Sequence, residues 1–161
     1  MGELIVVGVG ELALCNAQDA QLVTYGLGSC LAVAIHDAKV RVGGVLHLML
    51  PDSRLDPSRA LQRPAMFADT GLPRLFREAY ALGARKGRLR VVVVGGSNVM
   101  DSYGSFNIGA RNYAAVRRLF WRNNILIDAE DVGGTVNRTL GLEVGSGRVW
   151  IKTNSSESKE M

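Results

Sequence analysis

The sequence predicts a strand-rich α+β fold. Short apolar runs that alternate with period two, as half-buried strands do, recur along the chain, whereas two longer segments repeat apolar residues with helical spacing. The order of strands and helices is irregular, which is typical of the α+β class. The 161 residues, of which 47% are hydrophobic and 21% charged, are enough for one core. We therefore expect a single domain, followed from residue 153 by a polar, frayed tail.

The N-terminal third is expected to supply four strands. In the third of these, Leu31, Val33 and Ile35 alternate with smaller or polar neighbours. A turn is expected at 37–39, and Gly43-Gly44 in the strand after it predicts a bulge or a close backbone approach. The expected strands cover residues 4–7, 12–14, 31–36 and 40–50.

The rest of the chain alternates between helices and further strands. Residues 51–64 are polar and predict an exposed loop, and Pro73 is expected to begin a second helical segment at its first turn. Amphipathic spacing predicts helices over 65–84 and 110–123. Further strands are expected over 89–94, 125–129, 139–144 and 148–152.

Composition excludes several classes of protein. No apolar run approaches the roughly 20 residues of a membrane-spanning helix, and the N-terminus lacks the basic and apolar regions of a secretory signal, so we expect a cytoplasmic protein. Two cysteines and two histidines without CxxC or HxxxH spacing predict no disulfide framework and no metal site. The net charge is +4, and 15 of the 19 basic residues are Arg, which favours acidic partners. Aromatic residues total 6% and are not interleaved with the basic ones, which argues against nucleic acid.

A GxGxxA match at 8–13 resembles the fingerprint of dinucleotide-binding folds. That fingerprint requires a helix to open at the glycines and present its N-terminus to pyrophosphate. Here Leu12 and Leu14 alternate as in a strand, so we do not expect dinucleotide binding.

The strongest chemical signal combines Cys30 with His47. If 31–37 and 40–48 form a hairpin with Ala38-Lys39 as a two-residue turn, Cys30 lies directly opposite His47. Opposed side chains share one face of a sheet with Cβ atoms about 4.5–5.5 Å apart, close enough for a thiol and an imidazole to meet. Taken singly, a cysteine or a histidine in such a strand is more often a core residue. We expect Cys15 to be one, and His36 is a weaker candidate than His47 for a catalytic role.

An imidazole next to a thiol can take its proton and create a nucleophile. The glycine-rich segment before Cys30, including Gly28 and Ser29, would let backbone N–H groups approach a reacting carbonyl as an oxyanion hole does. Thr24 carries a hydroxyl that could orient His47 or the substrate amide.

Several segments, taken together, resemble the CheD family of chemoreceptor glutamine deamidases. The likeness covers nearly the whole chain, about residues 3–152, and lies in the order and spacing of the pieces. These are TYGLGSC at 24–30, GGVLHLMLP at 43–51, and the segments 65–69, 94–96, 108–112 and 131–134 with Arg138.

The resemblance implies one deamidase domain over 1–152, with mixed β-sheets layered with helices as in bacterial toxin-type cysteine deamidases. It implies that Cys30 is the nucleophile, that His47 and Thr24 complete the catalytic set, and that no cofactor is needed. Chemoreceptor cytoplasmic helices would be the substrate, with glutamine converted to glutamate. The family can also pair with a CheC-type phosphatase, so a non-catalytic regulatory partner is the alternative. A transglutaminase or a protease would use the same acyl chemistry.

Overall fold

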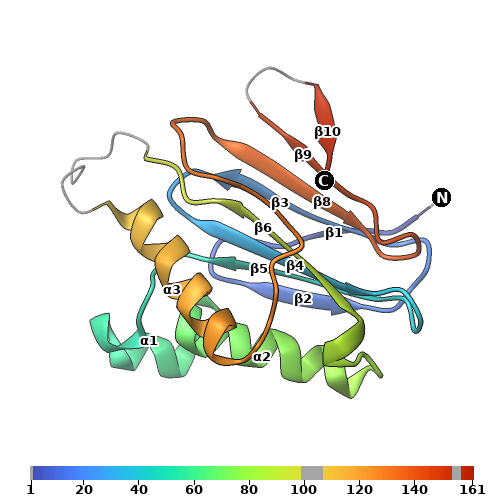
Figure 1. Ribbon diagram of the computed structural model, residues 1–161, viewed down its shortest axis with the longest axis horizontal. Helices are drawn as coiled ribbons and strands as arrows, with labels where there is room; N and C mark the ends of the chain where they lie inside the picture. Colours follow the sequence, from blue (N-terminus) through green and yellow to red (C-terminus); the bar gives the residue numbers. More distant parts are fainter. Residues whose placement is uncertain (1, 99–106, 154–156) are drawn as a thin grey trace.

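The computed structural model describes residues 2–98, 107–153 and 157–161. In this part of the chain ten strands form two five-stranded sheets, which we call the outer and the central sheet (Figure 1). The outer sheet has the order β1 (Leu4–Val6), β3 (Gln21–Leu27), β8 (Arg138–Glu143), β9 (Val149–Lys152) and β10 (Ser158–Glu160). The central sheet has the order β2 (Leu12–Cys15), β5 (Val42–Leu48), β4 (Leu31–Asp37), β6 (Leu89–Gly95) and β7 (Ala129–Val132).

Both sheets are mixed. The β1–β3 and β6–β7 pairs are parallel and the other pairs are antiparallel. Three helices and three short 3₁₀ turns complete the described chain, and the α+β prediction is confirmed. They are η1 (Ser53–Leu55), α1 (Pro57–Gln62), η2 (Pro64–Met66), α2 (Ala68–Ala81), η3 (Lys86–Arg88) and α3 (Ile108–Arg122). No helix of the described residues is long and apolar enough to cross a membrane.

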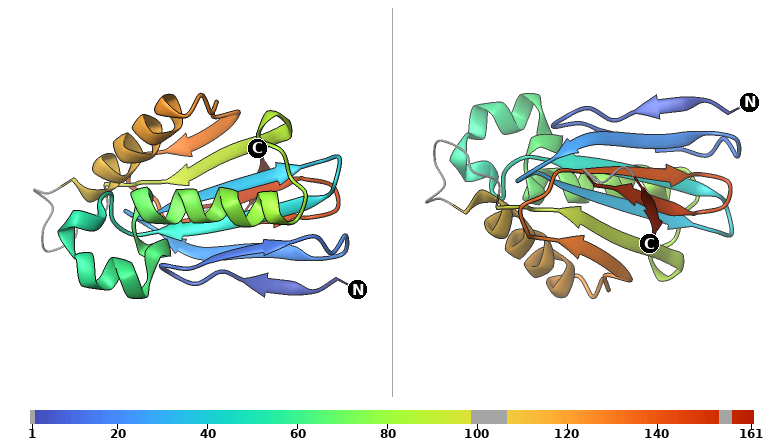
Figure 2. Two further views of the ribbon diagram at one scale, coloured as in Figure 1. Left: turned by 90° about the horizontal axis from the view of Figure 1, so that it is seen from below. Right: turned by 90° about the horizontal axis from the view of Figure 1, so that it is seen from above.

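The central sheet is covered on both faces, by the outer sheet on one side and by α2 and α3 on the other (Figure 2). Successive side chains of a strand point to opposite faces. On β4, Val33 and Ile35 belong to the helix-side core, whereas Ala32 and Ala34 belong to the core between the sheets. This double burial explains why β4 and β5 are buried along their whole length.

The β4–β5 hairpin differs from the predicted one. Its loop has four residues, 38–41, and Arg41 adopts the left-handed conformation with φ 53°. Ala32, not Cys30, therefore lies opposite His47. The shift of two positions keeps Cys30 and His47 on one side of the sheet, because side-chain direction repeats every second residue.

The expected bulge at Gly43-Gly44 does not occur, because the β4–β5 register is continuous there. The close approach does occur. A Cβ on Gly44 would lie 2.4 Å from Leu14 Cδ1 and 3.1 Å from Leu75 Cδ1.

Residues 51–64 were predicted to be an exposed loop, yet they contain η1 and α1. Asp52 accepts a hydrogen bond from Arg54 N, and Asp56 accepts one from Arg59 N, so each carboxylate caps a helical turn. Pro57 occupies the first turn of α1, where its missing N–H costs nothing. The α2 helix runs through Pro73 without a break.

Three further expectations were wrong in detail. β7 begins at Ala129 rather than at 125, β3 was not predicted as a strand, and the tail is not frayed throughout. Ser158–Glu160 pairs with β9, and the carbonyl of Met161 accepts a hydrogen bond from Arg90.

Candidate active site

Thr24 and His47 meet across the interface between the two sheets. Thr24 lies on β3 of the outer sheet and His47 on β5 of the central sheet, and both side chains are fully buried. Thr24 Oγ1 lies 2.7 Å from His47 Nδ1 and 2.6 Å from the carbonyl oxygen of Val7. An irregularity in β3 directly after Thr24, at a positive-φ Gly26, bends this strand next to the pair.

These two hydrogen bonds fix the tautomer of His47. A carbonyl oxygen can only accept, so the single Thr24 hydroxyl proton is donated to Val7. Thr24 Oγ1 must then accept from Nδ1–H of His47, which leaves Nε2 as the unprotonated nitrogen. Burial lowers the pKa of His47 to about 4, so the ring is neutral near pH 7.

His47 Nε2 is buried and has no hydrogen-bond partner among residues 2–98, 107–153 and 157–161. An unsatisfied buried nitrogen costs on the order of 1–3 kcal/mol, and such groups concentrate at functional sites. In this conformation Nε2 is a base without a proton.

Cys30 lies in the turn between β3 and β4, half-buried against the inter-sheet core that also contains Ala32. Its thiol is free, and burial raises the pKa of Cys30 above its ordinary value. The raised pKa of Cys30 and the lowered pKa of His47 both favour the neutral form of the side chain near pH 7.

Hydrogen bonds from neighbouring segments hold the turn that carries Cys30. Gly96 N donates to the carbonyl of Cys30 and Ser97 N to that of Gly28, both at 2.8 Å. Gly95 must be glycine, because its φ is 117° and a Cβ there would lie 2.4 Å from the Cys30 oxygen.

A buried arginine supports this arrangement from behind. Arg138 Nη1 donates to Ser97 Oγ at 2.8 Å, and Arg138 Nη2 pairs with Asp131 at 3.1 Å. Ser97 Oγ in turn donates to the carbonyl of Val136. Asp131 and Arg138 belong to the sequence resemblance described above, and together with Ser97 they form one support for the Cys30 turn.

Asn112 of α3 joins the segment that carries Cys30 to the segment that carries His47. Its Nδ2 donates to the carbonyls of Ser29 and Met49, both at 3.0 Å. Ser29 precedes Cys30 and Met49 follows His47 by two residues, so one buried amide fixes both segments. Sequence analysis placed Asn112 in a matching segment without giving it a role. A polar residue on the buried side of an amphipathic helix was the available signal.

Comparison with known proteins covers the whole chain. The family model described as CheD chemotactic sensory transduction matches residues 49–153. A probable chemoreceptor glutamine deamidase CheD 1 of Syntrophus aciditrophicus is 47% identical over all of both chains. A probable chemoreceptor glutamine deamidase CheD of Solibacter usitatus is 45% identical, over 98% of this chain and 93% of that one.

This chain belongs to the CheD family. The family-model match begins just after His47, whereas the relatives align over the segments that carry Thr24, Cys30 and His47 as well. A crystal structure of Neisseria meningitidis protein NMB0706, of family DUF152, has a TM-score of 0.49 at 9% identity, over 83% of this chain and 63% of that one. That likeness is too distant to bear on function.

The backbone amides of the expected oxyanion-binding segment of this CheD family member differ in their hydrogen bonding. Gly28 N donates to the carbonyl of Gly26 at 3.0 Å, so its amide is already engaged within the turn. The amides of Ser29 and Cys30 donate to no acceptor in the described part of the chain. These two N–H groups are the available donors.

The remaining cysteine and histidine have structural surroundings. His36 is buried, with Nε2 2.7 Å from the carbonyl of Val144, and does not face solvent. Cys15 is half-buried on β2, and its Sγ accepts a hydrogen bond from Ala17 N. The described residues contain no group of three or more His, Cys, Asp or Glu side chains that could hold a metal ion.

Asn112→Leu is expected to lower the turnover number for glutamine deamidation by about 10-fold or more while the protein stays folded. The change leaves two carbonyls without their donor, which costs on the order of 1–3 kcal/mol, and loosens the spacing between the Cys30 and His47 segments. Steady-state kinetics and circular dichroism check this expectation. Asn123→Leu is the matched control, because that amide donates to Leu119 of its own helix. Equal losses in both variants would refute the clamping role.

Acid should weaken the fold within a defined pH window. His47 takes up a proton near pH 4 in the folded protein but near 6.5 in the unfolded chain. The unfolded state thus binds more protons below pH 6.5, so the free energy of unfolding falls from there to about pH 4, by about 3 kcal/mol. Urea denaturation between pH 7 and 4 measures this loss. A His47→Gln variant should lack it, and an identical slope in that variant would contradict the assignment.

Proposed function

We propose that this chain is a chemoreceptor glutamine deamidase in which Cys30 is the nucleophile, His47 the general base and acid, and Thr24 the residue that orients His47. The names of its CheD relatives support the reaction and substrate. The observation that carries the mechanism is the buried Thr24–His47 hydrogen bond, which leaves Nε2 of His47 unprotonated and unpartnered.

In the first half-reaction the Cys30 thiol transfers its proton to His47 Nε2 as the sulfur attacks the carbon of a glutamine side-chain amide. The carbonyl oxygen becomes negatively charged and accepts hydrogen bonds from the amides of Ser29 and Cys30. His47 then returns the proton to the nitrogen, the C–N bond breaks, and ammonia leaves a thioester behind.

In the second half-reaction water attacks the thioester. His47 Nε2 accepts a proton from the water, the C–S bond breaks, and the Cys30 thiolate recovers the proton. The product is a glutamate side chain. Every step uses groups of this chain and water, so we propose that the reaction needs no metal or organic cofactor.

Mass spectrometry of a chemoreceptor cytoplasmic fragment incubated with the protein tests this proposal. In heavy-oxygen water, deamidation should add a single heavy oxygen atom at defined glutamines and release ammonia in equal amount. Attachment of an added primary amine would indicate a transglutaminase, and cleavage of the fragment a protease. An unmodified fragment would refute the deamidase proposal.

The proposed function also implies a cellular location and a candidate partner. Chemoreceptor glutamines of this kind lie on cytoplasmic helices, so we place the chain in the cytoplasm. A CheC-type phosphatase is a candidate regulatory partner, and a purely regulatory chain would bind it without modifying any receptor. Co-elution with the phosphatase in the absence of deamidation would favour that alternative.

A further inference from the structure

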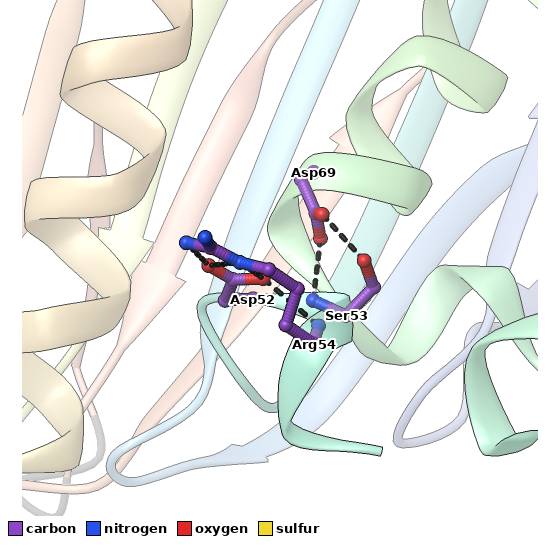
Figure 3. Close-up of polar contacts among 4 residues, drawn as sticks. All are labelled: Asp52, Ser53, Arg54 and Asp69. Carbon is purple, nitrogen blue, oxygen red and sulfur yellow. Dashed lines mark hydrogen bonds and ion pairs between the residues drawn. The ribbon is translucent and has the colours of Figure 1, made fainter. Parts of the chain in front are cut away.

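A groove of about 590 Å³ lies between α3 and the η1 segment. Arginines dominate its lining, and we call it the arginine groove after Arg111, Arg118 and Arg122 of α3 and Arg54 of η1. In Figure 3, the Arg54 side chain extends from η1 toward α3. All four arginines are exposed.

The two carboxylates in this groove are already engaged by the η1 segment. Asp52 pairs with Arg54 at 2.5 Å, and Asp69 accepts hydrogen bonds from Ser53 N at 2.9 Å and Ser53 Oγ at 2.6 Å (Figure 3). Asp52 stays ionised because the hydrogen bonds from Arg54 hold its pKa at about 2. Four arginines against two aspartates leave an excess of two positive charges.

The three groove arginines of α3 lack side-chain partners within the described part of the chain. No ion pair or side-chain hydrogen bond joins Arg111, Arg118 or Arg122 to a described residue. Arg118 is close enough to help lower the pKa of Asp52, yet forms no ion pair with it. Exposed guanidinium groups in a concave surface attract anions and steer them on approach.

The spacing of these arginines suits an elongated ligand. Arg111, Arg118 and Arg122 lie seven and four residues apart, which places them on one face of α3 over about 16 Å of helix. Small or apolar side chains, Ala114 and Leu119, line the groove between them. In a second helix lying alongside α3, carboxylates spaced four and seven residues apart would also share one face, so they could pair with these arginines. A compact phosphate would instead require donors that converge on one point, whereas these arginines are spread along the helix.

The groove starts beside the catalytic segments. Arg111 precedes Asn112, whose side chain holds the carbonyls of Ser29 and Met49. Pro51, four residues after His47, lines the groove. A helix with its glutamine at Cys30 could therefore extend into the groove.

We propose that the arginine groove docks the acidic face of the helical substrate segment, next to the residue that is modified. This inference rests on the proposed function, because it takes the substrate to be a helix that reaches Cys30. Ion pairs along the groove would give the enzyme preference for acidic helices and would speed their association at low salt.

Peptide binding tests docking separately from catalysis. The probe is a fluorescently labelled helical peptide of alanine and glutamate without glutamine, which cannot be deamidated, and its Kd is measured by anisotropy. The test variant is Arg118→Glu/Arg122→Glu. Lys152→Glu/Lys159→Glu is the control with the same charge change, on β9 and β10 of the outer sheet.

The groove variant should raise the Kd at least about 10-fold, and the control should change it less than about 2-fold. Added salt should weaken binding to the wild-type protein more steeply than to the groove variant. Equal effects of the two variants would overturn the proposal. So would a single-stranded oligonucleotide of equal charge that binds more tightly than the peptide through the same arginines.

A separate result decides the proposed function. If receptor glutamines are deamidated but the groove variant binds the peptide as the wild type does, docking is refuted and the enzyme assignment stands. If no deamidation occurs but the peptide binding depends on Arg118 and Arg122, the acidic-helix surface stands without the enzyme.

Discussion

Cys30→Ala is expected to abolish glutamine deamidation, with no turnover above the uncatalysed background, while the protein keeps its fold. The proposed reaction proceeds through a thioester, and alanine offers no atom that can form one. Because Cys30 is only half-buried in a turn, removing its sulfur should cost little stability. The measurement is peptide-level mass spectrometry of the receptor fragment after long incubation.

Cys15→Ala is the matched control, since it removes the other half-buried cysteine and should leave the rate unchanged. If the Cys30→Ala protein still deamidates the receptor fragment, another residue must be the nucleophile. The same variant distinguishes the deamidase from the regulatory alternative. It should lose deamidation but still bind a CheC-type phosphatase if that partnership exists.

His47→Gln is expected to lower kcat by about 10³-fold or more, because proton transfer by a positioned side chain contributes roughly 10²–10⁴-fold and His47 acts in both half-reactions. Glutamine can keep a hydrogen bond to Thr24 but cannot accept the thiol proton. Steady-state assays of deamidation of the receptor fragment, stopped at fixed times, measure the loss of kcat.

His36→Gln is the matched control for this substitution. It changes the other buried histidine, which contacts the Val144 carbonyl, and should leave kcat within a few-fold of the wild type. Comparable losses in the two variants would mean that His47 supports the core rather than the chemistry. The kcat of a Thr24→Val variant should lie between those of His47→Gln and His36→Gln, because the substitution leaves the base present but poorly oriented.

Sequence reasoning identified most of the elements because period-two alternation and helical spacing are local signals. It missed β3 because Gly26 and an exposed Tyr25 interrupt the alternation at the irregularity beside Thr24. It misplaced the hairpin register because the loop length depends on Arg41, a non-glycine residue in a left-handed conformation. Such conformations leave little trace in composition.

The candidate site was predicted in part for the same reasons. Thr24, Cys30 and His47 stood out through residue type and spacing, although the contact of Thr24 with His47 across the two sheets depends on long-range pairing. The role of Asn112 and the free amides of the Cys30 turn depend on contacts between distant segments. The arginine groove depends on the position of η1, a helical turn that Asp52 caps where a loop was expected.

The proposed base, His47, and the hydroxyl proposed to orient it, that of Thr24, belong to different sheets, and this has a thermodynamic consequence. A fluctuation that separates the outer sheet from the central sheet would break the Thr24–His47 hydrogen bond while leaving the strand ladders intact. Such sub-global openings have lower free energies than complete unfolding. Activity should therefore be lost on warming before the helices melt, and we expect the molecule to be catalytically competent only while the two sheets stay packed together.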